Sequence, residues 1–206
     1  MARDIQMRLV YAWEREAYPG YFDKARSMVV PEAREMIRKV HADVRSAGGF
    51  AHEAPVVKFT KRNGSACASW GRLKFTPSML TPEIVLHEIA HSLTWNYEAT
   101  RVAMRLPRGQ RGPLHEHALR RFCTQGHGPR YVACFIALCE RYAGHSAELA
   151  LSIARGFKYQ AWGPWRTVRA QAEGGTAYMR ERATVTKFGS VRVDMDALAY
   201  WRALLA

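Results

Sequence analysis

Apolar residues recur at helical spacing in two segments near the start of the chain. The first segment ends at Pro19-Gly20, and the second runs from Pro31 to Gly48-Gly49. Residues three or four positions apart lie on one face of an α-helix, so the pattern predicts two amphipathic helices. Their apolar faces comprise Ile5, Leu9, Ala12, Trp13 and Ala17 in the first helix, and Ala33, Met36, Ile37, Val40 and Val44 in the second.

Shorter apolar runs follow, and their length is typical of β-strands. They occupy residues 56–60, 66–70 and 73–76. Asn63-Gly64 is a strong signal for a hairpin turn between the first two runs. Residues 82–95 then return to the helical period. We therefore predict an α+β fold in which a small mixed or antiparallel sheet packs on this helix.

The second half of the chain begins with a polar, arginine-rich connection over residues 97–113. The apolar period that follows predicts a short helix over 114–124 and a longer helix that begins at Pro129. Ser146 and Gly156 are the predicted cap and end of a third helix.

The C-terminal segment has weaker signals. Residues 157–175 show neither the helical nor the strand period, so we predict irregular structure there. Runs over 183–188 and 190–193 flank Gly189 and predict a hairpin. Residues 194–205 predict a closing helix, and we interpret Asp194 and Asp196 as helix-capping residues.

The motif His87-Glu88-Ile89-Ala90-His91 lies within the predicted helix 82–95. Residues four apart share a helix face, so both imidazoles can reach one zinc ion, which takes nitrogen ligands at about 2.0–2.1 Å. Glu88 can then accept a proton from a bound water. Thr81-Pro82-Glu83 opens the helix with a hydroxyl cap, a proline and an acid. The alternative interpretation is two core histidines and a glutamate bonded to backbone.

A catalytic zinc site usually has a third protein ligand and an open position. We predict His127 as that ligand, because it stands at the start of a helix between glycines that permit close approach. The alternatives are Glu98, His115, Glu116 and His117. Zinc is the predicted metal, with manganese or iron as alternatives.

Two parts of the chain resemble a family of actinobacterial and actinobacteriophage zinc metallohydrolases. They are Val85–His91 together with His127–Val132, and the opening residues 3–12. The histidine arrangement is also similar to that of SprT-like and Spartan-like proteases. The resemblance implies a zincin-like metallohydrolase domain over residues 1–160, with zinc on His87, His91 and His127, Glu88 as base, and a location in the cytoplasm of a bacterium or of a phage-infected cell.

Two details extend or limit this resemblance. Residues 161–206 are not covered by it, and we predict that they form an extension of loop, hairpin and helix packed on the same domain. Relatives commonly have an acid after the H-G-P element, where this chain has Arg130. Any role of that acid in orienting a ligand or substrate is therefore lost or inverted here.

A hydrolytic site of this kind acts on an amide carbonyl, and the tetrahedral charge that develops usually needs one more donor. Tyr131 and Tyr97 are the candidates for that donor, with simple packing as the alternative for each. A strand within residues 66–76 could bind an extended peptide by main-chain pairing. We therefore expect a protein or peptide substrate.

Composition limits the class of protein. No apolar run approaches the about 20 residues of a membrane span, and Met1–Gln6 lack the apolar core of a signal peptide. We expect no membrane partner. No two cysteines form a C-x-x-C pair, so we predict free thiols and no zinc ribbon. The cysteines are Cys67, Cys123, Cys134 and Cys139.

The net charge of +13 and the pI of about 10.0 indicate a polyanionic partner, with nucleic acid as the first candidate. The predicted contacts are Arg101, Arg105, Arg108, Arg111, Arg120 and Arg121. Residues 155–169 interleave basic and aromatic side chains, as surfaces that hold single strands do; a core of aromatics with an ordinary basic surface is the alternative. The competing function is a nucleic-acid-binding protein with a structural or vestigial metal site.

Overall fold

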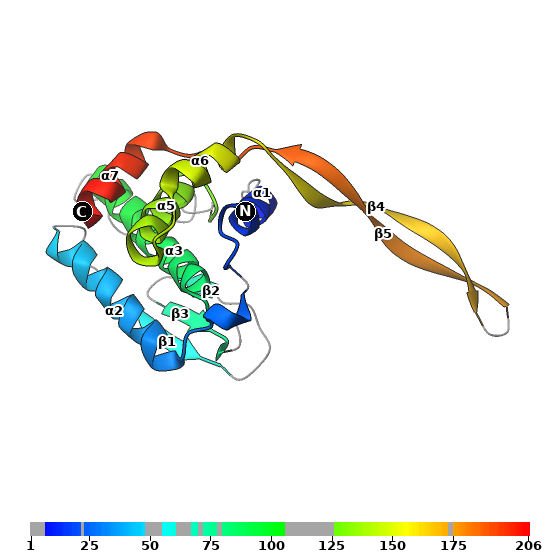
Figure 1. The fold of residues 1–206 in the computed structure, drawn as a ribbon, viewed down its shortest axis with the longest axis horizontal. Helices are drawn as coiled ribbons and strands as arrows, with labels where there is room; N and C mark the ends of the chain where they lie inside the picture. The colour runs from blue at the N-terminus through cyan, green and yellow to red at the C-terminus, as the bar shows by residue number, and fades with distance from the viewer. Residues whose placement is uncertain are drawn as a thin grey trace.

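The computed structural model describes residues 7–21, 23–47, 55–60, 67–69, 72–77, 80–105, 126–172 and 175–206, with the backbone alone for 67–69, 95–105, 161–172 and 175–185. The described chain has an α+β fold, as the sequence predicts. A body of packed helices carries a small sheet, and a long two-stranded hairpin projects away from that body (Figure 1).

The centre of the helical body is α5 (Pro129–Ala143), whose residues 131–139 are all buried. Three helices pack against it, and they are α3 (Pro82–Arg105), α6 (Ala147–Arg155) and α7 (Met195–Leu205). The predicted caps Ser146 and Asp194 are confirmed, because each accepts a hydrogen bond from the backbone N–H three residues on, whereas Asp196 is not the cap and lies in the first turn of α7. Apolar burial on every side of α5 fixes the position at which its N-terminus meets α3.

The two predicted N-terminal helices are present as α1 (Met7–Ala17) and α2 (Val30–Ser46), with the short 3₁₀ helix η1 (Lys24–Arg26) between them. α1 packs on α6, and α2 packs on α3. Ile5 lies outside the described residues. α1 buries Val10, Trp13, Glu14 and Ala17, so a carboxyl group stands among the apolar residues of its inner face.

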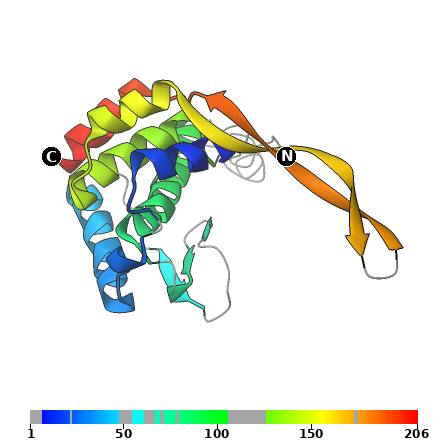
Figure 2. The ribbon, with the colours of Figure 1, turned by 45° about the vertical axis from the view of Figure 1, so that its right-hand side comes forward.

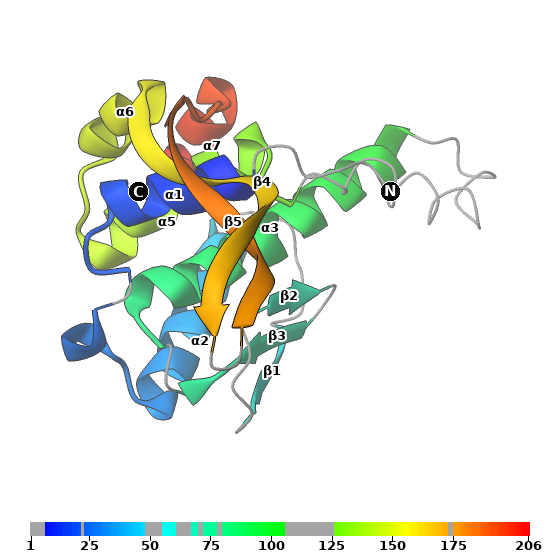
Figure 3. The same ribbon diagram turned by 90° about the vertical axis from the view of Figure 1, so that its right-hand side faces the viewer.

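The predicted sheet is present beside α3 and is mixed, but the predicted hairpin between its first two strands is wrong, because those strands are not neighbours (Figure 3). Its strands are β1 (Val56–Phe59), β2 (Cys67–Ser69) and β3 (Arg72–Phe75), in the order β1-β3-β2. β3 is parallel to β1 and antiparallel to β2. Leu73 and Phe75 are fully buried, because alternate residues of the central strand face the helices.

Residues 183–188 form a strand as predicted, but the rest of the prediction for residues 157–193 is wrong. Residues 157–172, predicted as irregular, form β4 (Phe157–Ala172), which pairs along its length with β5 (Gly175–Gly189) (Figure 2). Residues 190–193 are not a strand and lead directly to α7. Gly163-Pro164 break the sequence pattern but lie at a register shift within β4. A hairpin that projects from the body has no single buried face, so its apolar and polar residues need not alternate. The sequence therefore shows no strand period there. The predicted boundary at residue 160 falls inside β4 and stays a prediction.

The helix that carries the H-E-x-x-H motif is longer than predicted. It continues to Arg105, so the prediction of an irregular connection is wrong for residues 97–105. No glycine or proline interrupts the sequence before Pro107, and alanine, methionine, glutamate and arginine favour a helix without help from packing. The predicted helix over 114–124 lies outside the described residues.

The start of α3 is held by several polar contacts. The Thr81 hydroxyl donates a hydrogen bond to the Tyr21 carbonyl and accepts a long one, at 3.4 Å, from the Ile84 N–H. Glu83 is fully buried, and its Oε1 atom lies 2.7 Å from an Arg26 nitrogen and 2.8 Å from His145 Nε2. These contacts tie the first turn of α3 to η1 and to the end of α5, which fixes the direction of the histidine face.

Candidate metal centre

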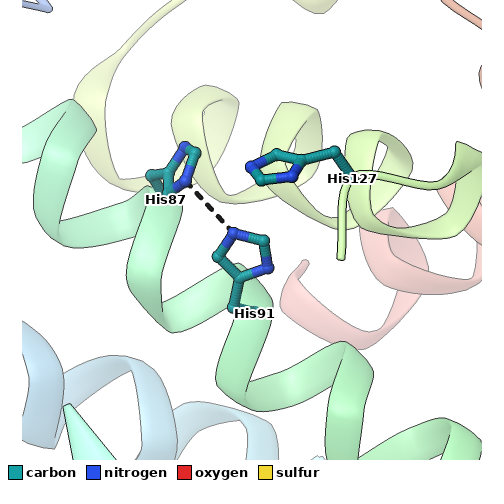
Figure 4. A group of neighbouring side chains, drawn as sticks. All are labelled: His87, His91 and His127. Carbon is teal, nitrogen blue, oxygen red and sulfur yellow. Dashed lines mark hydrogen bonds between the residues drawn. The ribbon is translucent and has the colours of Figure 1, made fainter. Parts of the chain in front are cut away.

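Three histidines converge where α3 passes the N-terminus of α5 (Figure 4). His87 and His91 lie one helical turn apart on α3, and His127 stands two residues before α5 begins. Their ligating nitrogen atoms all lie within 4.8 Å of one another. His87 and His127 are buried, and His91 is partly buried. The cluster can hold a metal ion, and the predicted convergence of these three residues is confirmed.

The spacing of the nitrogens suits a tetrahedral ion. Nε2 of His87 and Nε2 of His91 lie 3.1 Å apart, and two ligands of one zinc ion at about 2.0–2.1 Å lie about 3.3 Å apart. Ligands on opposite sides of such an ion lie at most about 4.2 Å apart. The whole set spans up to 4.8 Å, so the third nitrogen has to come closer to the other two when an ion binds.

Burial favours the neutral form of the α3 histidines. It lowers the pKa of both His87 and His91 well below the usual value, and the charge of His127 acts in the same direction on each. A neutral imidazole keeps the lone pair that binds a metal. Three imidazole donors suit zinc and also accept copper, iron or nickel, so the donor set indicates a metal without selecting one.

Glu14 of α1 holds the far edge of the His87 ring. Its carboxyl is fully buried, and its Oε1 atom lies 2.9 Å from His87 Nδ1. A proton on Nδ1 that is shared with this carboxyl leaves the lone pair on Nε2, which faces the other histidines. Metal-bound histidines commonly donate their second N–H to a carboxylate, which fixes the tautomer and the ring orientation.

Two tyrosine hydroxyls complete this outer layer. Tyr21 and Tyr131 place their oxygens 2.9 and 2.6 Å from His87 Nδ1, and Tyr131 also donates to Glu14 Oε1 at 3.1 Å. Burial raises the pKa of Glu14 to about 8, although His127, Tyr131 and Tyr21 favour its ionised form. A cation on the other edge of His87 would also favour the carboxylate, because an opposite charge nearby lowers the pKa of an acid.

His91 has an outer contact of its own. It hydrogen-bonds the backbone of Gly126, which raises its pKa against the larger effect of burial. Gly126 directly precedes His127, so this bond ties the segment that carries the third histidine to α3. The Tyr131 ring stacks on His91 with centroids 4.2 Å apart. Each α3 histidine is therefore oriented by groups from other elements.

Glu88 lies beside the cluster but is not one of its three members. It is only 5% exposed. Burial, then Glu14, and to a smaller extent the charge of Glu88, raise the pKa of the Tyr21 and Tyr131 hydroxyls. Its role as a base stays a prediction.

The remaining predicted site residues are distributed differently. The Tyr131 hydroxyl contacts His87 Nδ1 and Glu14, on the opposite edge of the ring from Nε2, so the geometry favours orientation of the ligand over stabilisation of a transition state. Arg130 forms an ion pair with Asp194 at 3.2 Å, which links α5 to the cap of α7. The side chains of Tyr97, Arg101 and Arg105 and the alternative ligand Glu98 lie outside the described set, as do His115, Glu116, His117, Arg108, Arg111, Arg120 and Arg121 in full.

Sequence reasoning missed the contribution of α1. Glu14, Tyr21 and Tyr11 are all close to the cluster, and the Tyr11 ring lies 5.5 Å from that of His87 and 4.8 Å from that of His127. One signal was present in the sequence. Glu14 follows Val10 by four positions and precedes Ala17 by three, so it interrupts an apolar face with a carboxyl group. A buried acid needs a partner.

Comparisons of the chain with protein-family models, with curated proteins and with solved structures found no match.

The buried cysteines Cys134 and Cys139 are free thiols, as predicted. Among the described helices, none is both long and apolar enough to span a membrane. The candidate metal centre is defined by its own geometry.

We expect the substitution Glu14→Gln to weaken zinc binding by about 10- to 100-fold, the usual effect of removing an outer-layer partner of a ligand. Glutamine keeps the size of the side chain but cannot accept the Nδ1 proton as a carboxylate does. The measurement is a competition titration of the metal-free protein with a chromophoric chelator. Glu16→Gln on the exposed face of α1 removes the same charge and serves as the control. Equal affinity in the two variants would show that Glu14 has no effect on the metal.

Proposed function

We propose that this protein is a zinc-dependent metallohydrolase and that it acts as a metallopeptidase. One observation carries the proposal. Three histidine nitrogens converge within 4.8 Å, and a largely buried glutamate follows the first histidine on the same helix. Three protein ligands leave one position of a tetrahedral ion for water or substrate, as in catalytic zinc sites, whereas structural sites fill all four positions.

His87, His91 and His127 would hold the zinc ion, which when bound would supply Lewis acidity and lower the pKa of a water to about 7. Glu88 is the base in our proposal: its carboxylate would accept a proton from the attacking water and later deliver it to the leaving nitrogen. Glu14, Tyr21 and Tyr131 keep His87 in the required tautomer and orientation. The partial burial of the site limits access of bulk water to these groups.

The same residues support a zincin-like relationship, which we also propose. The sequence elements around His87–His91 and His127 resemble those of actinobacterial and phage metallohydrolases and of SprT-like proteases. The supporting features in the fold are a small mixed sheet beside the helix that carries H-E-x-x-H, and a second helix that presents the third histidine.

A peptide substrate is supported by the sheet next to α3. β2 is at one end of the strand order β1-β3-β2 and contacts α3. Within the described residues it pairs only with β3, so its other edge can accept an extended peptide by main-chain hydrogen bonds. A peptide bound there runs beside the helix that carries His87 and His91.

Metal removal tests this proposal. We expect a chelator to abolish cleavage of an unfolded protein such as reduced casein, and stoichiometric zinc to restore it. The measurement is the appearance of new amino termini, with zinc content determined on the same samples. If one zinc ion binds per chain but neither casein nor a mixed peptide library is cleaved, the metal site is supported and the proposal of a peptidase is overturned.

A further inference from the structure

The β4–β5 hairpin projects from the helical body, and its pairing is known from Phe157↔Gly189 to Ala172↔Gly175 (Figures 1 and 2). In an antiparallel pair, directly opposed residues share a face, and so do residues two positions apart on one strand. Trp162 and Trp165 pair with Thr184 and Arg182, which are two apart on β5. The register shift therefore keeps both tryptophans on one face.

This face combines aromatic and basic residues. Opposed pairs on it are Trp165 with Arg182, and Arg169 with Tyr178, while Arg180 opposes Thr167 between them. We call it the arginine–aromatic face and define it by Trp162, Trp165, Arg169, Tyr178, Arg180 and Arg182.

The opposite face is different in character. Within the described strands the only acid is Glu181, and it pairs with Arg166 on that opposite face. The neighbouring pairs there are Val168 with Met179 and Ala170 with Ala177. Among the described residues of that face, Lys187, which opposes Tyr159, is the basic residue without an opposing acid, so most of the unopposed positive charge lies on the arginine–aromatic face.

The base of the hairpin shows the same combination with its side chains described. Phe188 is 79% exposed, and the Lys158 Nζ atom lies 5.5 Å from the centre of its ring. These two residues are an opposed pair, and the register places them on the arginine–aromatic face. An exposed aromatic ring beside a cation offers both a stacking surface and a phosphate contact.

We propose that the arginine–aromatic face binds single-stranded nucleic acid, with phosphates on the arginines and bases stacked on the aromatic rings. A positively charged strip interleaved with aromatics holds single strands without reading their sequence. A duplex hides the faces of its bases, whereas a single strand offers a planar base beside every phosphate. The net charge of +13 adds to the attraction for any polyanion.

The test is fluorescence anisotropy of a labelled single-stranded oligothymidylate with the full chain at increasing salt. The double substitution Arg180→Ala with Arg182→Ala is expected to weaken binding about tenfold or more. It should also reduce the slope of log affinity against log salt by about 1.4, because each lost phosphate contact on a single strand contributes about 0.7. Arg166→Ala with Lys187→Ala removes the same charge from the opposite face and should leave the slope unchanged.

Stacking is tested separately by Trp165→Ala, which we expect to weaken binding about 5- to 100-fold with the salt slope unchanged. Met179→Ala on the opposite face is the matched control. Circular dichroism melting of each variant shows whether it folds. Affinity for a duplex or for anionic vesicles as high as for the single strand would overturn the proposal, as would equal effects of the two double substitutions. Absence of binding at low salt would also overturn it.

This inference does not rest on the proposed hydrolase. Glu88→Gln should bind the oligothymidylate as the natural sequence does, and Arg180→Ala with Arg182→Ala should keep its zinc and its casein cleavage. Loss of cleavage in the hairpin variant together with loss of DNA binding would mean that the two surfaces are not separate and would contradict the assignment.

Discussion

Glu88→Gln is expected to reduce peptide cleavage by about a hundredfold or more while leaving one zinc ion per chain. The expected loss follows from the contribution of a positioned acid or base, which is about 10²- to 10⁴-fold in rate. Glutamine has nearly the same shape as glutamate but cannot accept a proton at neutral pH. The side chain is 5% exposed and lies outside the three-histidine set, so the substitution removes a proton acceptor without removing a ligand.

Two measurements on the same preparation distinguish catalysis from folding. Zinc content by mass spectrometry should match that of the natural sequence, and cleavage of casein should fall. Glu16→Gln on the exposed face of α1 removes an equal charge and should change neither. Intact cleavage in Glu88→Gln would rule out Glu88 as the base. Loss of zinc in that variant would instead mean that the carboxyl acts as a ligand.

The part of the site that follows a local period could be predicted from the sequence. His87 and His91 share a helix face because they are four residues apart, and helix formation at Thr81-Pro82 is encoded by a cap and a first-turn proline. His127 required a further step, since it lies 36 positions after His91 (127 − 91). The neighbouring glycines and proline indicate the start of a helix. The contact of His127 with the other two histidines arises because α5 packs on α3.

The outer layer of the site could not be predicted in the same way. Glu14 and Tyr21 reach His87 only because α1 packs on α6 and the chain after it returns past the start of α3. Neither residue belongs to a motif. An acid within an apolar helix face indicates that Glu14 needs a partner. It does not indicate which histidine is that partner.

The β4–β5 hairpin could not be predicted from the sequence for a different reason. Its residues lack a simple period, because the ribbon projects from the body and the register shifts after Trp162. Pairing between β4 and β5 is local in sequence, yet the sequence pattern places the turn at Gly189, which in the structure pairs with Phe157 at the base of the hairpin. Once the pairing is known, the six residues of the arginine–aromatic face fall together on one side of the ribbon. The positions of the charged residues can therefore be interpreted only when the register between β4 and β5 is known.

His127→Ala is expected to weaken zinc binding by more than the about 10- to 100-fold that we expect for Glu14→Gln. It removes a ligand, whereas Glu14→Gln only loosens one. Two imidazoles on one helix face remain, with their Nε2 atoms 3.1 Å apart, but two protein ligands are fewer than catalytic zinc sites use. The measurement is zinc content after dialysis against a competing chelator, with the natural sequence treated in parallel.

The control for this prediction comes from the alternative ligands. His115→Ala and His117→Ala each remove one imidazole from the chain and should keep full zinc content if His127 is the third ligand. Full zinc in His127→Ala, with loss in His115→Ala or His117→Ala, would move the third ligand to that residue. Because Gly126 ties this segment to His91, restoration of zinc binding by His127→Cys, which provides another zinc-binding side chain at the same position, would separate ligation from the structural role of the loop.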